Sequence, residues 1–211
     1  MAAEVGSMKR LLCLFVALLP GITLGNIDQE WRFRVLIDES EVGTHTFRVT
    51  EQSGERRVAS DARFNVKLWF INAYTYTHRA RERWRGECLE DIEARTDDNG
   101  ALKSVRGMRN GTSFELDNAK LPGCVMSFAY WNPAMLKQTR LLNSQTGEFT
   151  DVRIETVGAE TIQVRGESVS ARRYALHAPK FRIDLWYLDD ARWVRLESRT
   201  ESGRMLRYFI Q

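Results

Sequence analysis

Residues 181–210, with the sequence FRIDLWYLDDARWVRLESRTESGRMLRYFI, decide the fold class of this chain. Three runs in this stretch, residues 181–188, 192–200 and 204–210, alternate large apolar side chains with polar ones. A period of two is typical of β-strands, because successive side chains of a strand point to opposite faces. Short polar links such as Glu201-Ser202-Gly203 suit tight turns. The stretch therefore predicts consecutive antiparallel strands.

The same period extends toward the N-terminus. The first run places Trp31, Phe33, Val35 and Ile37 on one face of a strand, and turn signals such as Asn110-Gly111 separate later runs. Strands at intervals of about 8–12 residues indicate an all-β antiparallel meander, folded as a sandwich or a barrel. The further candidate strands cover residues 44–50, 63–70, 73–84, 87–96, 161–165 and 168–177.

Residues 124–142, CVMSFAYWNPAMLKQTRLL, depart from this alternation. Asn132 suits an N-cap and Pro133 the first helical position, so the sequence predicts a short helix over residues 133–141 that packs on the sheet. The large apolar side chains around it allow two interpretations. They either complete the hydrophobic core, as aromatic clusters usually do, or contact a ligand. The candidate ligand-binding residues are Phe128, Tyr130, Trp131, Met135 and Leu136.

The N-terminal residues 1–25 have the pattern of a secretory signal peptide. Lys9-Arg10 precede the apolar run of residues 11–19, and Pro20-Gly21 end it. This run is too short to cross a bilayer core of about 30 Å. We therefore expect cleavage before Asn26, a periplasmic or secreted protein with no stable membrane span after cleavage, and one β-rich domain over residues 26–211.

Composition and charge narrow the function classes. The 211 residues are 43% hydrophobic and 28% charged, which excludes disordered and low-complexity classes. The net charge of +3 is too small for a dedicated nucleic-acid binder, so we expect no nucleic-acid partner. The chain has neither a phosphate-binding glycine loop nor a G-x-S-x-G elbow, and we expect no cofactor and assign no catalytic residue. The oligomeric state stays open.

Two cysteines, Cys88 and Cys124, remain once the leader is removed. An even count in an oxidising compartment favours a disulfide. Two buried thiols or a metal-binding pair are the alternatives, and we expect no metal because no histidine lies at ligand spacing from either cysteine. If bonded, both cysteines should be buried with Cα atoms about 5–6 Å apart. The bond would then anchor the segment, and only residues 135–142 could move as a lid.

Arg79, Arg81, Arg83 and Arg85 form a basic row around Trp84. The simpler interpretation is a solvated strand face whose long side chains cover apolar rings. The alternative is a site for anionic groups, such as lipid headgroups or acidic polysaccharide.

Several motifs carry a resemblance to known proteins. Together they resemble a bacterial family of secreted proteins of unknown function, over residues 27–211. More distantly, the chain is similar to an uncharacterised periplasmic family with a sheet like that of the lipoprotein-localisation carriers, whose half-barrel encloses a hydrophobic cavity. This resemblance implies a strongly curved antiparallel sheet, a half-barrel or open barrel. The carriers cover theirs with several short helices, whereas this sequence has one candidate, the short helix over residues 133–141 that packs on the sheet. The motifs are VGTH (42–45), YTYTHRARERWRGECL (74–89), MSFAYWNP (126–133), LLNSQTGE (141–148) and LWYLDDARWVRLE (185–197).

Three function classes follow. The first is a non-enzymatic protein that binds an apolar or amphipathic, lipid-like ligand on its concave face, because large apolar residues lie on both faces of residues 181–188. The second is a structural or protein-interaction module of the cell envelope with a filled interior and no ligand cavity. The third is a hydrolase, which requires His45, His78 or His177 to meet an acid in one pocket.

Overall fold

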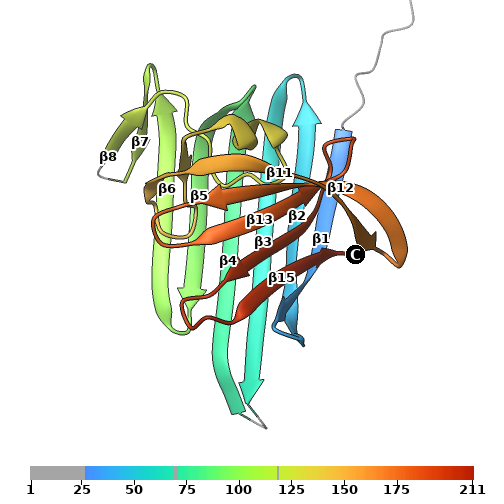
Figure 1. Cartoon of the computed structure of the whole chain (residues 1–211). Helices are drawn as coiled ribbons and strands as arrows, with labels where there is room; N and C mark the ends of the chain where they lie inside the picture. Colours follow the sequence, from blue (N-terminus) through green and yellow to red (C-terminus); the bar gives the residue numbers. More distant parts are fainter. Residues whose placement is uncertain (1–26, 69–70, 118) are drawn as a thin grey trace, which may run out of the picture.

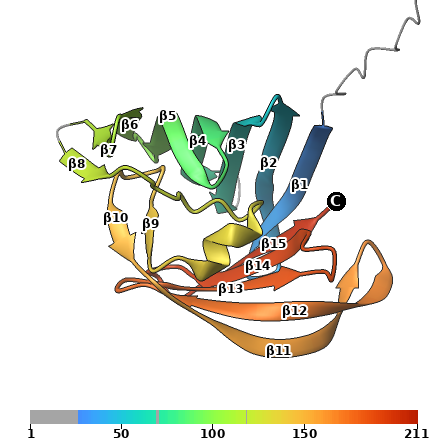
Figure 2. The same cartoon turned by 90° about the horizontal axis from the view of Figure 1, so that it is seen from above.

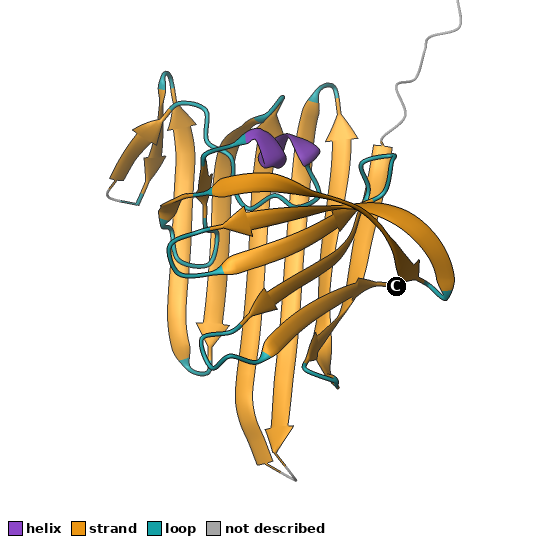
Figure 3. Cartoon of the chain, in the orientation of Figure 1, coloured by secondary structure: helices purple, strands orange, loops and turns teal. Residues whose placement is uncertain are grey.

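The computed structural model describes residues 27–68, 71–117 and 119–211, and the expected signal peptide lies outside them (Figure 1). Strands dominate these residues, and the helix among them is one short 3-10 turn (Figure 3). The elements are β1 (Ile27–Ile37), β2 (Ser40–Gln52), β3 (Glu55–Leu68), β4 (Ile71–Arg85), β5 (Cys88–Asp98), β6 (Ala101–Asn110), β7 (Ser113–Leu116), β8 (Ala119–Pro122), η1 (Pro133–Lys137), β9 (Arg140–Leu142), β10 (Phe149–Asp151), β11 (Arg153–Val164), β12 (Glu167–His177), β13 (Arg182–Tyr187), β14 (Trp193–Arg199) and β15 (Met205–Ile210).

A single antiparallel sheet of 13 strands forms the domain, in the order β11-β12-β13-β14-β15-β1-β2-β3-β4-β5-β6-β7-β8. Neighbours in the sheet are mostly neighbours in sequence, and the exception joins the two ends of the chain, where β1 pairs with β15. The sheet curls so that β1–β8 and β11–β15 form two facing layers (Figure 2). Because β8 and β11 stand at the two ends of the described sheet order, the sheet is not closed. The predicted curved antiparallel half-barrel is confirmed.

The predicted alternation decides which side chains fill the interior. Trp31, Phe33 and Val35 of β1 are buried, as are Phe47 and Val49 of β2. These side chains belong to one continuous core that also takes in residues from β12 to β15. Burial of apolar area at about 25 cal/mol per Å² makes this core the main source of stability.

Residues 123–152, which we call the inner segment, lie between the two layers of the sheet (Figure 2). Asn132 caps η1 as predicted, because its side chain accepts a hydrogen bond from the Ala134 amide at 3.1 Å. The prediction of a helix to residue 141 was wrong: η1 ends at Lys137, and β9 follows and pairs with β10. Leu141 and Leu142 explain the change, since both are fully buried and only an extended chain points successive side chains to opposite sides.

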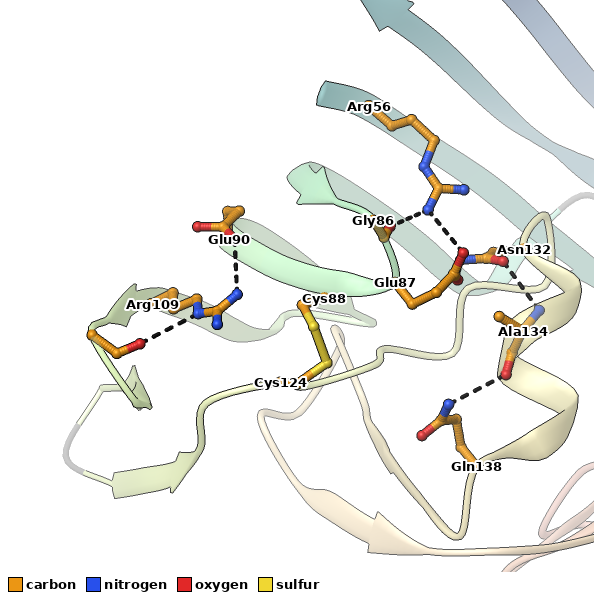
Figure 4. Close-up of a disulfide and its surroundings, with 11 residues drawn as sticks. Arg56, Gly86, Glu87, Cys88, Glu90, Arg109, Cys124, Asn132, Ala134 and Gln138 are labelled. Carbon is orange, nitrogen blue, oxygen red and sulfur yellow. Dashed lines mark hydrogen bonds and ion pairs between the residues drawn. A yellow bond between two sulfur atoms is a disulfide. The ribbon is translucent and has the colours of Figure 1, made fainter. Parts of the chain in front are cut away.

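The disulfide joins Cys88, at the start of β5, to Cys124 in the inner segment (Figure 4). Their Cα atoms are 4.8 Å apart, within the range that disulfides require although slightly below the expected value. The prediction that both cysteines are buried was wrong, because Cys88 is partly buried and Cys124 is exposed. Cys124 lies two residues after the end of the edge strand β8, so the bond lies at the rim of the sheet rather than in the core.

The idea of a lid also needs correction. Met135 in η1 and Leu141 and Leu142 in β9 have 0% exposure, so the distal part of the inner segment is core rather than a movable cover. A second link holds it near η1: the Asn132 side chain donates a hydrogen bond to Glu87 at 2.8 Å, and Arg56 pairs with Glu87 at 3.6 Å (Figure 4). The inner segment is therefore fixed at several points.

A second, smaller apolar cluster lies apart from the main core. Trp186 and Val194 pack there against Ile162 and Ala171 of the β11–β12 hairpin. The guanidinium groups of Arg173 and Arg195 stack over the Trp186 ring at 5.1 and 4.9 Å. This cluster accounts for the apolar residues on both faces of β13 without a ligand.

The arginine row on β4 alternates with inward-facing residues. Arg79 pairs with Asp61 at 3.2 Å and Arg83 pairs with Glu55 at 3.5 Å. Trp84 is fully buried and packs in the core, so the expectation that the row surrounds this ring was wrong. Successive side chains of a strand point to opposite faces. The arginines of the row alternate with core residues, so they face away from the core.

Candidate functional site

A cavity of about 280 Å³ lies inside the half-barrel, where β2, β3 and β4 face β13, β14 and β15. The cavity is partly open to solvent, and its lining combines apolar side chains with hydroxyl, amide and imidazole groups. The apolar side chains are Phe47, Phe128, Phe181, Ile183, Leu196 and Leu206. The polar side chains include His45, Ser60, His78, Asn143, Ser144 and Tyr208.

The sheet register brings the two histidines together. His45 on β2 pairs with Ala62 on β3, and Ala62 pairs with His78 on β4. Two strand spacings of about 4.8 Å place the histidine Cα atoms about 10 Å apart in one row. Since Ala62 between them is small and only 1% exposed, the two imidazoles are separated by no large side chain on β3.

Gly43 positions His45 by fixing the path of β2. Its φ of +154° is unfavourable for other residues, and a Cβ there would lie 1.9 Å from the Arg63 carbonyl oxygen. The backbones of β2 and β3 can therefore approach closely only with glycine at this position. The VGTH motif owes its glycine to this approach, two residues before the cavity wall.

Each histidine is held by hydroxyl groups. His45 Nε2 is 2.7 Å from Ser60 Oγ, and its Nδ1 is 3.4 Å from Tyr208 Oη. The His45 ring also stacks on Phe47, with 4.1 Å between ring centroids. His78 Nδ1 is 2.9 Å from Thr96 Oγ1, and its Nε2 is 3.4 Å from Ser144 Oγ. Rotatable hydroxyls can either donate to or accept from an imidazole, so both rings are satisfied without an ionic partner.

Burial keeps both imidazoles neutral near pH 7. Burial, with a smaller contribution from the nearby His78, lowers the pKa of His45 from 6.5 to about 3. Burial likewise lowers the pKa of His78 to about 4, against an opposing effect from Asp61. The wall of the cavity is therefore polar but uncharged, because the described residues that line it include no carboxylate, ammonium or guanidinium group.

Glu82 lies next to this cavity on the same strand as His78. It lines a void of about 20 Å³ that shares Ser60 and Ser144 with the main cavity. Ser127 Oγ and Trp84 Nε1 donate hydrogen bonds to the Glu82 carboxyl at 3.1 and 3.0 Å. Burial raises the pKa of Glu82 to about 7, and these two hydrogen bonds partly oppose the shift.

Replacing Glu82 by glutamine should make the domain more stable at about pH 8 but not at about pH 4. Because the folded-state pKa of Glu82 exceeds its ordinary value of 4.5, the unfolded chain releases this proton first as the pH rises, and stability falls between pH 4.5 and about 7. The shift corresponds to about 3 kcal/mol as an upper limit. Urea denaturation at the two pH values measures the gain. Glu93→Gln, at an exposed position, is the control and should show no such dependence on pH. If Glu82→Gln changed the stability equally at the two pH values, or if Glu93→Gln showed the same gain at about pH 8, the raised pKa of Glu82 would be contradicted.

The structure divides the residues predicted to contact a ligand. Phe128 and Tyr130 line the main cavity, and Trp131 lines the small void beside Glu82. Met135 is fully buried in the core, and Leu136 packs against that core. Phe128 and Tyr130 are therefore placed to contact a ligand in the main cavity, whereas Met135 and Leu136 contribute to the packing of the core.

The polar residues of the cavity were missed as a group. His45 and His78 were each visible in the sequence on an apolar strand face, but their common row depends on strand register. The third histidine, His177, lies on β12 and pairs with Glu155 at 3.0 Å, outside the cavity lining. Among the described residues, no group of three histidine, cysteine or acidic side chains lies close enough to hold a metal ion.

The contact between Ser60 and His45 has the length of a nucleophile–base pair. A base of this kind must become an imidazolium during the reaction, and it normally has a carboxylate beside it. His45 instead faces Tyr208, and its lowered pKa opposes protonation. The arrangement therefore suits hydrogen bonding better than proton transfer.

Comparison with known proteins agrees with the fold. A family model described as "Domain of unknown function (DUF6134)" matches residues 33–211. The fold is similar to that of a crystal structure described as a β-barrel-like protein of the domain of unknown function DUF1849 from Brucella abortus, with a TM-score of 0.63 and 10% sequence identity, over 86% of this chain and 94% of that one. No curated protein matches the chain significantly. At this identity the likeness shows the fold alone.

Proposed function

Because the chain belongs to DUF6134, a family of unknown function, we propose its role from the cavity: the half-barrel binds a small amphipathic, lipid-like molecule in its interior. The observation that carries this proposal is the lining of the cavity, which combines large apolar side chains with a few polar, uncharged groups. Ligand sites are usually apolar clefts with a few convergent polar groups, and their volumes begin at about 300 Å³. A cavity of about 280 Å³ fits a small ligand or part of a longer chain.

The rival interpretation is a structural or protein-interaction module with a filled interior. Native cores contain few voids larger than a water molecule. A cavity of about 280 Å³ inside the half-barrel, with convergent polar groups in an apolar lining, is not expected of a filled interior and favours a binding role over a packed scaffold. For a hydrolase, the described residues of the cavity wall lack the acid that the histidines would need.

We also place this function in the periplasm or outside the cell. The Cys88–Cys124 disulfide is compatible with an oxidising compartment. In the part of the chain that the structure describes, helices of the length and hydrophobicity needed to cross a bilayer are absent.

Filling the cavity should abolish ligand binding. Leu206 lines the cavity and is only partly buried, so Leu206→Trp should occupy the space with little strain. The uncharged fluorescent probe N-phenyl-1-naphthylamine measures binding by its emission, and native mass spectrometry of protein purified without detergent detects lipids that copurify. We expect binding to the parent protein and at least about 10-fold weaker binding to the variant, a loss of about 1.4 kcal/mol.

The matched control is Leu102→Trp, which adds the same ring at an exposed position on β6. This variant should bind the probe as the parent does. If the parent protein binds no probe and carries no lipid, the proposed function is wrong. Equal binding by both variants would place the probe outside this cavity.

A further inference from the structure

We infer that the cavity selects ligands with an uncharged hydrogen-bonding head group, such as an alcohol, ester or amide, and rejects the corresponding carboxylate, phosphate and ammonium compounds. This inference rests on the proposed function and deepens it. The group of side chains that would receive the head is Ser60, Ser144, His45 and His78, all of which line the cavity.

The geometry of this group allows it to serve both donors and acceptors. Each imidazole contacts a serine hydroxyl, at 2.7 Å for His45 with Ser60 and 3.4 Å for His78 with Ser144. A neutral imidazole has one donor and one acceptor nitrogen, and a serine hydroxyl can rotate to play either role. An alcohol, which donates and accepts, or an ester carbonyl, which only accepts, could therefore join the network by reorientation of hydroxyl protons.

The same network offers no compensation for a charge. The described side chains that line the cavity are uncharged near pH 7. The nearby guanidinium groups of Arg63 and Arg79 are exposed and are held by Asp61 at 3.1 and 3.2 Å. A carboxylate or phosphate placed against His45 and His78, which are 8% and 3% exposed, would lose its hydration without gaining a counter-charge, which is unfavourable.

Glu82 adds to the discrimination against anions. Its carboxyl lies in the void that adjoins the cavity through Ser60 and Ser144. Near neutral pH a fraction of this carboxyl is ionised, which would repel an anionic head. A cationic head could approach this carboxyl only through that void, whose volume of about 20 Å³ admits about one water-sized group, and would have to lose its hydration to do so.

The test is a series of compounds that share one decyl chain: decanol, methyl decanoate, decanoate, decyl phosphate and decylammonium. Each compound, at a concentration below its own critical micelle concentration, competes with N-phenyl-1-naphthylamine for binding to the protein at about pH 7.5. The protein used is the full chain without the expected signal peptide. Decanol and methyl decanoate should displace the probe at least about 30-fold more effectively than the three charged compounds, since an unpaired buried charge costs about 2 kcal/mol or more.

Serine variants test whether the hydroxyl groups of Ser60 and Ser144 bind the head group. Ser60→Ala and Ser144→Ala should each weaken decanol binding about 5-fold, the typical value of one hydrogen bond, without weakening binding of the probe. Ser104→Ala is the matched control, because Ser104 is exposed on β6 and does not line the cavity. This control should leave decanol binding unchanged, and thermal melts verify that all three variants fold.

Each outcome decides the inference. Equal displacement by charged and uncharged compounds would overturn it while leaving the proposed function intact. Preferential binding of decylammonium would overturn it and identify Glu82 as a counter-ion. If neither the probe nor any decyl compound binds, both the inference and the proposed function fail.

Discussion

Lowering the pH from about 7 to about 3 should destabilise the domain strongly, and His45 and His78 should account for most of the loss. Both imidazoles are neutral in the folded state because burial lowers their pKa from 6.5 to about 3 and about 4. The unfolded chain therefore binds protons that the folded chain does not. The stabilisation that the two neutral imidazoles contribute is therefore fully present above pH 6.5. It is lost as the pH falls toward the lowered pKa values of His45 and His78.

The size of this effect follows from the shifts. About 3.5 pH units for His45 and about 2.5 for His78 correspond to upper limits of about 5 and about 3 kcal/mol. Glu82 acts in the opposite direction, because its raised pKa returns up to about 3 kcal/mol as the pH falls from about 7 to 4.5. The net loss remains a large fraction of the 5–15 kcal/mol that is typical of a whole domain.

The measurement is urea denaturation followed by tryptophan fluorescence at a series of pH values. His45→Gln keeps a neutral hydrogen-bonding group beside Ser60 and should flatten the dependence between pH 6.5 and about 5.5, where ordinary carboxyls remain largely ionised. His177→Gln, which changes a histidine outside the cavity, should retain the parent slope. A slope unchanged by His45→Gln would show that the buried imidazoles are not the cause of acid unfolding.

Local patterns in the sequence predicted the strands well, and long-range contacts account for what they missed. The alternation of Trp31, Phe33 and Val35 identified both a strand and its buried face. The pairing of β1 with β15 was not predictable in this way, because it joins residues at opposite ends of the chain. The helical propensity of residues 133–137 was informative, but the burial of Leu141 and Leu142 between two layers overrode it beyond Lys137.

The cavity was less predictable than the fold. Aromatic content pointed to residues 128–136, and part of that group does line the cavity. The common row of His45 and His78 in the cavity lining depends on Ala62, which pairs with both, and the registers of two strand pairs fix this relation. A shift of one residue in either register would move a histidine to the outer face, and single-sequence patterns do not determine register to that accuracy.

Removing the disulfide by the double change Cys88→Ala and Cys124→Ala should lower the free energy of unfolding by about 4 kcal/mol. The bond joins residues 36 apart in sequence, and the loss of loop-closure entropy in the unfolded chain gives this magnitude. Little native packing depends on the two sulfurs, since Cys124 is exposed and Cys88 only partly buried. The lower free energy of unfolding should therefore come mainly from the greater conformational entropy of the unfolded chain. Denaturant midpoints of the oxidised, reduced and double-variant proteins measure this decrease.

Loss of the bond should not release the inner segment as a lid. The Leu89 amide donates to the Val125 carbonyl, Tyr187 Oη donates to the Tyr130 carbonyl at 2.8 Å, and Asn132 remains bound to Glu87, so three links to the sheet do not involve the cysteines. Hydrogen exchange of the double variant under native conditions should accelerate near residue 124, while amides of residues 135–142 stay protected up to global unfolding. Adding Asn132→Ala to the double variant should extend the loosening toward η1, because it removes the link that lies nearest to that turn. Rapid exchange throughout residues 135–142 in the double variant alone would contradict a fixed interior and restore the idea of a hinged cover over the cavity.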